Sequence, residues 1–141
     1  MDTSGNYLRN QFCSYEIALK LKELGFDEKC FAIYDAYQDN RLVYLCEDGR
    51  NPSGTIKTNA SMDFSCLAPL YQQVVGWFRE KYKIIVYVQP CFDNKGENEK
   101  YQWMIKPRNR VFMKNGDFKT YEEARENAIL KAIELCQNKK F

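Results

Sequence analysis

A basic segment beside two aromatic residues is the part of this sequence best suited to binding chemistry. The segment 106–114, KPRNRVFMK, contains no acidic residue and follows a strand-like stretch that carries Tyr101 and Trp103. Basic side chains beside exposed aromatic rings hold phosphate groups while the rings stack on bases. Basic residues at a sheet edge also keep that edge from pairing with other chains, so the pattern has a structural alternative. The candidate ligand-binding residues are Tyr101, Trp103, Lys106, Arg108, Arg110 and Lys114.

The sequence lacks the residue patterns of the common catalytic and metal sites. It contains no His, so the commonest general base is missing. The six Cys are widely spaced and include no Cys-x-x-Cys pair, which removes the usual zinc-ligand spacings. Carboxylates gather in turns and at helix starts, where capping and solvation explain them. We therefore expect a protein that is not an enzyme and that needs no metal or cofactor.

The charge balance argues against binding of polyanions over the whole surface. The formal charge is +2, from 21 basic and 19 acidic side chains, so any contact with nucleic acid or an anionic membrane has to be local. No apolar run approaches the length of a membrane span, and the polar N-terminus indicates no secretory segment. The Cys residues are interpreted as small buried hydrophobes of a reduced, cytoplasmic protein.

The stretch 65–89 combines an amphipathic helix with an apolar strand. Its helical part carries one broad apolar stripe, which is typical of a helix packed on a sheet. The stripe consists of Leu67, Leu70, Tyr71, Val74, Val75, Trp77, Phe78 and Tyr82. The strand at 83–89 is apolar on both faces, which predicts a central strand covered on more than one side. Trp77 is therefore expected in the core, whereas the pattern around Trp103 fits a buried and an exposed ring equally well.

Capping residues delimit two further helices. Ser14 is a suitable N-cap and Gly25 a suitable C′ residue for a helix over residues 15–24. Thr120 and Glu123 form a capping box at the start of the last helix. Alanines on one side of that last helix predict a close approach to the layer beneath it.

The first half of the chain also contains a predicted hairpin followed by a long irregular segment. Residues 30–37 and 41–46 read as two strands joined by turn-forming residues. Residues 47–63 lose all periodicity and gather Gly, Pro, Ser, Asn and Asp. A segment of this kind is either a functional loop or a solvated connector, with a short edge strand around residues 55–58 as a further alternative.

The remaining strands complete a meander, and the whole order indicates the fold class. Residues 101–106 are predicted to return antiparallel to the preceding strand, and a short strand over 110–114 ends at an Asn115-Gly116 turn. Helices and strands do not alternate, so the expected fold is α+β, an antiparallel sheet of about four to five strands with helices packed largely on one face. Residues 1–141 are expected to form a single domain, with residues 1–12 as a flexible leader.

Three segments carry a resemblance to a known group of proteins. SYEIALKLKELGFDEKCFAIYD, APLYQQVVGWFREKYKIIVYV and TYEEARENAILKAIELC together resemble small uncharacterised proteins of phages and prophages of gut Bacteroidetes. The resemblance implies a viral accessory protein in the host cytoplasm. Proteins of that kind often act by binding, either to host defence proteins or to signalling nucleotides. The matching residues are mostly core and capping positions, so no catalytic residue is carried over.

These observations lead to three hypotheses of different classes. The first is a non-catalytic phage or prophage binding protein that recognises a host protein or a small anionic, nucleotide-like ligand. The second is a module for single-stranded nucleic acid that uses the sheet face with Tyr101 and Trp103. The third is a self-associating protein, a homodimer formed through an open hairpin edge at 30–46. The hairpin residues expected at that edge include Tyr34, Tyr37, Val43 and Tyr44.

Overall fold

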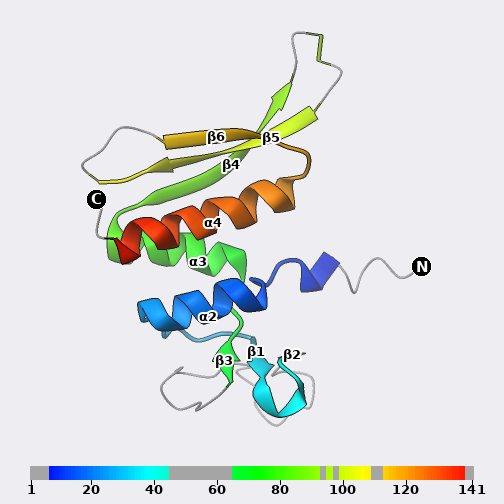
Figure 1. The fold of residues 1–141 in the computed structure, drawn as a ribbon, viewed down its shortest axis with the longest axis vertical. Helices are drawn as coiled ribbons and strands as arrows, with labels where there is room; N and C mark the ends of the chain where they lie inside the picture. The colour runs from blue at the N-terminus through cyan, green and yellow to red at the C-terminus, as the bar shows by residue number, and fades with distance from the viewer. Residues whose placement is uncertain (1–6, 45–64, 93–94, 97–98, 109–112, 139–141) are drawn as a thin grey trace. The chain divides into compact units, whose positions relative to one another are not determined.

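The chain forms two compact units, each built around its own antiparallel sheet. The computed structural model describes residues 7–44, 65–92, 95–96, 99–108 and 113–138. The units comprise residues 1–71 and 72–141, and each contains three paired strands (Figure 1). The mixture of helix and sheet is confirmed, but the strands are divided between two sheets and do not form one sheet of about four to five. The single domain stays a prediction, because two compact units can belong to one domain.

The first helix of the N-terminal unit, α2, spans Tyr15–Leu24, as its capping residues predict. The Ser14 hydroxyl accepts a hydrogen bond from the backbone N–H of Ile17 and so satisfies one unpaired donor of the first turn. Gly25 ends the helix with φ 100°, a left-handed conformation that glycine adopts without steric cost. The buried face consists of Ile17, Ala18 and Leu21.

The predicted hairpin is confirmed and gains a third strand. Strands β1 (Ala32–Asp35) and β2 (Arg41–Tyr44) are joined by the short helix η1 (Ala36–Gln38), and β3 (Cys66–Leu67) pairs with the other side of β1. The predicted loop at 47–63 lies outside the described residues, as does the short strand considered around 55–58.

The helical stripe was expected to include Leu67 and Leu70, and that prediction is wrong for both. Leu67 belongs to β3 and Leu70 forms a β-bridge with Phe12, and helix α3 (Tyr71–Trp77) begins only after Leu70. A residue that precedes proline is sterically disfavoured in the helical conformation. The backbone N–H of Ala68 donates to the Ala32 carbonyl, which extends the pairing with β1.

The residues before α2 are held more firmly than a flexible leader. Phe12 is buried and forms a β-bridge with Leu70. The Cys13 N–H donates to the Pro69 carbonyl over 2.8 Å, and the Tyr71 N–H donates to the Gln11 carbonyl over 2.9 Å. Residues 11–12 of the predicted leader are thus paired with residues 70–71, while residues 1–6 lie outside the described part of the chain.

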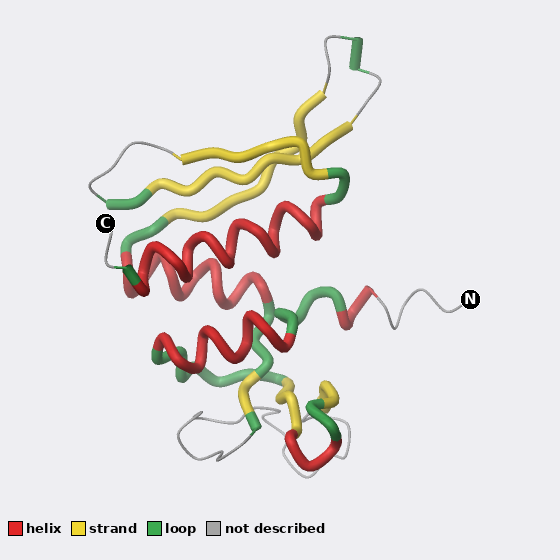
Figure 2. The backbone as a smooth tube through the Cα atoms, viewed as in Figure 1, coloured by secondary structure: helices red, strands yellow, loops and turns green. Residues whose placement is uncertain are grey.

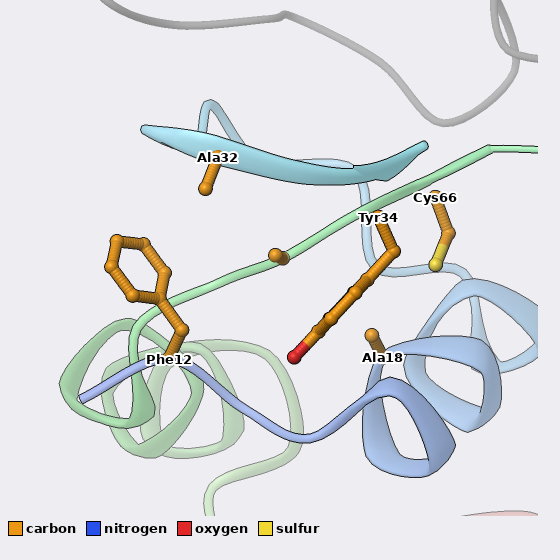
Figure 3. Close-up of a cluster of buried hydrophobic side chains, with 6 residues drawn as sticks. Phe12, Ala18, Ala32, Tyr34 and Cys66 are labelled. Atoms are coloured by element: carbon orange, nitrogen blue, oxygen red, sulfur yellow. The ribbon is translucent and has the colours of Figure 1, made fainter. Parts of the chain in front are cut away.

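A small apolar core joins the sheet and α2 of the N-terminal unit. Figure 3 shows side chains from the strands pointing toward Phe12 and Ala18. The Tyr34 hydroxyl donates to the Cys13 carbonyl, and its ring packs edge-on against Tyr15. Tyr34 is buried, so it is not one of the exposed edge residues that the homodimer hypothesis expected. The cluster comprises Phe12, Ala18, Ala32, Tyr34, Cys66 and Ala68.

The C-terminal unit begins with a helix that changes type near its end. α3 continues into η3 (Phe78–Tyr82), a π-helical segment that stops at Lys83 with φ 58°. Trp77 is buried and makes edge-on ring contacts with Phe78 and Tyr82, at 5.3 Å between centroids in each case. The prediction that Trp77 belongs to the core is confirmed, since the ring fills space between aromatic neighbours.

The sheet of the C-terminal unit has the strand order β4-β5-β6. β4 (Ile85–Phe92) and β6 (Met113–Phe118) are its edges, and β5 (Glu99–Lys106) lies between them. The prediction of a central strand at 83–89 is therefore wrong. Its apolar residues on both faces reflect a buried side toward the helix and an exposed side that carries Ile85 and Tyr87.

The last strand lies further along the chain than predicted. The register between β5 and β6 shifts after Trp103 pairs with Asn115, and Tyr101 then pairs with Phe118. The Asn115-Gly116 pair was expected to form a turn, but both residues lie inside β6. Asp117 takes a left-handed conformation with φ 69° at this irregularity, which accommodates the extra residue of a β-bulge.

Helix α4 (Tyr121–Gln137) covers one face of this sheet (Figure 1 and Figure 2). The Thr120 hydroxyl accepts from the backbone N–H of Glu123, as the capping box predicts. The small side chains of Ala124, Ala128 and Ala132 are fully buried. Within the described residues no helix has the length and apolar character needed to cross a membrane.

We expect Trp77→Ala to lower the free energy of unfolding by about 3–5 kcal/mol, because it removes a buried ring that packs on two others. Urea denaturation followed by circular dichroism measures this change. Gln72→Ala, an exposed position in α3, is the control and should stay within about 0.5 kcal/mol of the original protein. Equal effects of the two substitutions would contradict the packing described for Trp77.

Candidate functional site

Trp103 lies in the core of the C-terminal unit and is not a stacking surface. Only 4% of its surface is exposed, and its indole N–H donates to the Asn127 side-chain oxygen on α4 over 3.0 Å. The neighbouring inward residue of the same strand, Ile105, is fully buried. The hypothesis that Trp103 stacks on bases is therefore wrong, because the face of the sheet that carries it is covered by α4.

Tyr101 occupies the same face, near the start of α4. Its ring packs edge-on against Tyr121, and its hydroxyl donates to the Glu99 carboxylate over 2.8 Å. That hydrogen bond raises the pKa of Tyr101, and the nearby Glu122 carboxylate acts in the same direction. Two carboxylates around the hydroxyl make this end of the face unsuitable for an anion.

Lys106 and Lys114 lie on the opposite face of the sheet from the two aromatic residues. In β5, side chains alternate, so Lys106 points away from the face that Trp103 and Ile105 share. Lys106 pairs with Ile85, and Met104 pairs both with Tyr87 and with Lys114. Directly opposed residues of an antiparallel pair share a face. The predicted basic and aromatic residues are thus divided between two faces.

These side chains define what we call the open face, the side of the C-terminal sheet turned away from α4. Tyr87 and Ile85 are 38% and 49% exposed, although both belong to a strand whose alternate residue Val86 is buried. Near the start of β4, the open face combines three apolar side chains with two basic ones. The residues at this end of the face are Ile85, Tyr87, Met104, Lys106 and Lys114.

The other two predicted basic residues flank this face or fall outside the description. Arg108 is exposed and follows β5 directly after the buried Pro107, so the strand leads straight to it. Arg110 lies outside the described residues. β5 ends where β4 and β6 begin, so Lys106, Arg108 and Lys114 all belong to the same end of the sheet.

The opposite end of the open face is electrically balanced. Lys100 lies there, and its ammonium is 3.8 Å from the Asp117 carboxylate at the bulge of β6. An exposed ion pair of this kind contributes little to stability, but it cancels much of the local charge. The basic side chains at the other end of the open face are those of Lys106 and Lys114.

The sequence pattern did not single out Tyr87, Ile85 or Met104 as site residues. All three are apolar, and the alternating pattern of 83–89 was read as a strand buried on both sides. The sequence of a single strand does not indicate how many helices cover its sheet, because that number depends on the whole unit. A strand with one face toward a single helix layer leaves its other apolar residues in contact with solvent.

Three of the described cysteines have thiols that stay protonated near neutral pH. Burial raises the pKa of the Cys30 and Cys136 thiols to about 12 and that of Cys66 to about 11. A protonated thiol is a poor nucleophile and a poor metal ligand. Within the described residues no group of three or more His, Cys, Asp or Glu side chains could hold a metal ion. Cys13 is also buried, which agrees with the interpretation as small hydrophobes, whereas Cys91 is half-buried.

Comparisons with known proteins leave the structure as the main guide to function. No protein-family model matches the chain, and neither a curated protein nor a solved structure is similar to it. The resemblance to phage proteins therefore remains an expectation from the three sequence segments, and the open face has to be judged on its own chemistry.

We expect Trp103→Ala to destabilise the protein by about 3–5 kcal/mol, because it opens a cavity beneath α4. Trp103→Phe keeps most of the apolar volume and removes only the N–H donor to Asn127, so its cost should be clearly smaller. Urea denaturation of both variants measures the difference. A Trp103→Ala variant as stable as the original protein would contradict the buried position.

The buried thiols also predict a loss of stability in alkaline solution. Thiols in the unfolded chain titrate near pH 9.0, whereas the folded Cys30 and Cys136 hold their protons to about pH 12. The stabilising contribution is complete below about pH 9 and is lost as the pH rises toward about 12. Urea denaturation at several pH values above 8 tests this. A Cys30→Ala, Cys136→Ala variant should show a shallower decline, and an equal decline would contradict the role of these thiols.

Proposed function

We propose that this protein works by binding, without catalysis, and that the open face of β4–β6 is its site for a small anionic, nucleotide-like ligand. The resemblance to phage proteins supports the further proposal of an accessory protein that acts on a host component in the host cytoplasm.

One observation carries the proposal, namely the cross-strand row formed by Tyr87, Met104 and Lys114. Register places these three residues directly beside one another on adjacent strands, with Lys106 two residues from Met104 on the same face. A tyrosine ring and a methionine thioether offer a flat, polarisable surface for a base. The ammonium groups of the two lysines are carried on flexible side chains and can contact a phosphate.

The composition of the surrounding surface favours a compact anion over a long polymer. The chain has a formal charge of only +2, and the far end of the open face is balanced by the Lys100 pair with Asp117. A ligand whose charge is concentrated in one or two phosphates can contact Lys106 and Lys114 without approaching the Asp117 carboxylate. The affinity should therefore fall with salt concentration only as steeply as one or two phosphate contacts require.

A second candidate, single-stranded nucleic acid, is favoured by the length of β5. Lys100 and Lys106 belong to the same face of this strand and are six residues apart, which corresponds to about 20 Å at the usual rise. An oligonucleotide could follow the strand from one lysine to the other and place one base on Tyr87. This candidate uses the open face and needs no contribution from Trp103.

Thermal unfolding in the presence of nucleotides tests the first candidate. A ligand at about a hundred times its dissociation constant adds about 2.7 kcal/mol to the free energy of unfolding, and this raises the melting temperature measurably. The double variant Lys106→Glu, Lys114→Glu should lose the shift. Lys95→Glu with Lys119→Glu makes the same change in net charge away from the open face and should keep it.

Salt dependence separates the two candidates. Each phosphate contact on a single strand contributes about −0.7 to the slope of log affinity against log salt concentration, so an oligonucleotide spanning the face gives a steep slope and a mononucleotide a shallow one. If neither ligand shifts the melting temperature, or if both charge-reversal pairs act alike, the open face is not the binding site.

A further inference from the structure

The two edge strands of the C-terminal sheet differ in how they are protected against pairing. β6 carries Lys114 and Asp117 and contains the bulge, and charges and bulges are common means of blocking an edge. β4, with the sequence IVYVQPCF, contains no charged residue in its eight positions. An uncharged edge is more open to pairing with a further strand than a charged one.

β4 also carries a concentration of exposed apolar side chains. Ile85 and Tyr87 are exposed by 49% and 38% and share the open face, whereas Phe92, exposed by 60%, belongs to the other face by the alternation of the strand. Single exposed hydrophobes are ordinary, but grouped ones mark surfaces that interact with another molecule. The exposed side chains and the uncharged edge belong to the same strand, so one partner could cover both.

The backbone limits which part of this edge can pair. The Ile84 N–H, just before β4, donates to the Phe78 carbonyl in η3, so the π-helical segment already occupies the outer side of the chain there. Pro90 has no N–H, and prolines in sheets lie on edge strands with their nitrogen turned away from the ladder. The backbone groups of every second residue point to the same side of a strand, so those of Val86 and Val88 point to the same side as those of Ile84 and Pro90. This side is the edge away from β5.

We propose that the partner of this edge is β4 of a second copy of the chain, paired antiparallel about a two-fold axis at Tyr87. In this register Val86 lies opposite Val88 of the partner subunit, and about four backbone hydrogen bonds form between the two edges. Tyr87 then lies opposite Tyr87 of the partner subunit, with the Cα atoms about 4.5 Å apart.

The short window favours one register of pairing over its two neighbours. Moving the axis to Val88 would place Pro90 opposite Val86 of the partner subunit and lose a donor. Moving it to Val86 would require the Ile84 N–H, which is already used by Phe78. All three registers form about four hydrogen bonds, but only the axis at Tyr87 pairs both the N–H and the C=O of Val86 and of Val88 in both chains. The opposed side chains are apolar and uncharged, so no repulsion results.

The dimer is independent of the proposed ligand, although it would affect the same surface. Pairing at β4 joins the C-terminal sheets of the two copies into one sheet. The open faces of both copies then lie on the same side, with Tyr87 of one copy next to Tyr87 of the other. Because self-association is measured without any ligand, its failure and the failure of the proposed function can be distinguished. A contact of this size is at the small end for a stable dimer, so protein concentration has to be varied.

A disulfide between two copies tests the axis directly. Tyr87→Cys should form an intermolecular disulfide under mild oxidation, because Cα atoms about 4.5 Å apart fit the geometry of that bond. The background should carry Cys91→Ser and Cys46→Ser, since Cys91 is half-buried and Cys46 lies outside the described residues. Gln89→Cys in the same background is the control. Its Cα would lie opposite Ile85 of the partner subunit, too far from the second engineered cysteine.

Analytical ultracentrifugation of the unmodified chain provides the second measurement. The expected result is a concentration-dependent mass that approaches twice the 16.7 kDa of one chain. Tyr87→Glu places two carboxylates opposite each other on the axis and should give a monomer, with circular dichroism verifying that the variant is folded. A monomer at every concentration would overturn the proposal. Equal cross-linking at positions 87 and 89 would do the same.

Discussion

The packing of α4 against one face of the β4–β5–β6 sheet is the interaction on which the rest of the C-terminal unit depends. Trp103 fills the space beneath the helix, and buried alanines on α4 allow the helix to approach closely. A large ring against small residues interdigitates without leaving a cavity. Once this face is buried, the alternation of each strand decides which side chains reach the other face. The open face is thus a consequence of the core.

The sequence predicts best what local interactions determine. The bounds of α2 and the start of α4 follow from Ser14, Gly25 and Thr120, because a capping residue acts on backbone groups only a few positions away. The hairpin of β1 and β2 is equally local. Sheet membership is not, since the pairing of β1 with β3 joins segments separated by a long stretch of chain. Period-two alternation gives two faces without indicating which of them a helix will cover.

The same distinction explains the outcome for the candidate site. Lys106 and Lys114 lie in strands, as the sequence predicts, but their proximity to Tyr87 depends on the register between three strands. Asn115-Gly116 has the composition of a turn, yet a bulge with Asp117 in a left-handed conformation absorbs the irregularity within β6. Tertiary pairing therefore decided the position of the site, and turn propensity yielded to it.

Tyr87 connects the two proposals physically, because it supplies a ring to the open face and lies on the proposed axis of the β4 edge. If the paired form, where two tyrosines lie side by side, binds a ligand more tightly than the single chain does, then by linkage the ligand must strengthen the pairing by the corresponding factor. The sign of this coupling depends on the second Tyr87 ring. The coupling is positive if that ring enlarges the flat surface on which the ligand lies, and negative if it covers that surface. Lys106 and Lys114 belong to β5 and β6, away from the β4 edge. Charge and self-association can therefore be varied separately, and only changes at Tyr87 should alter both.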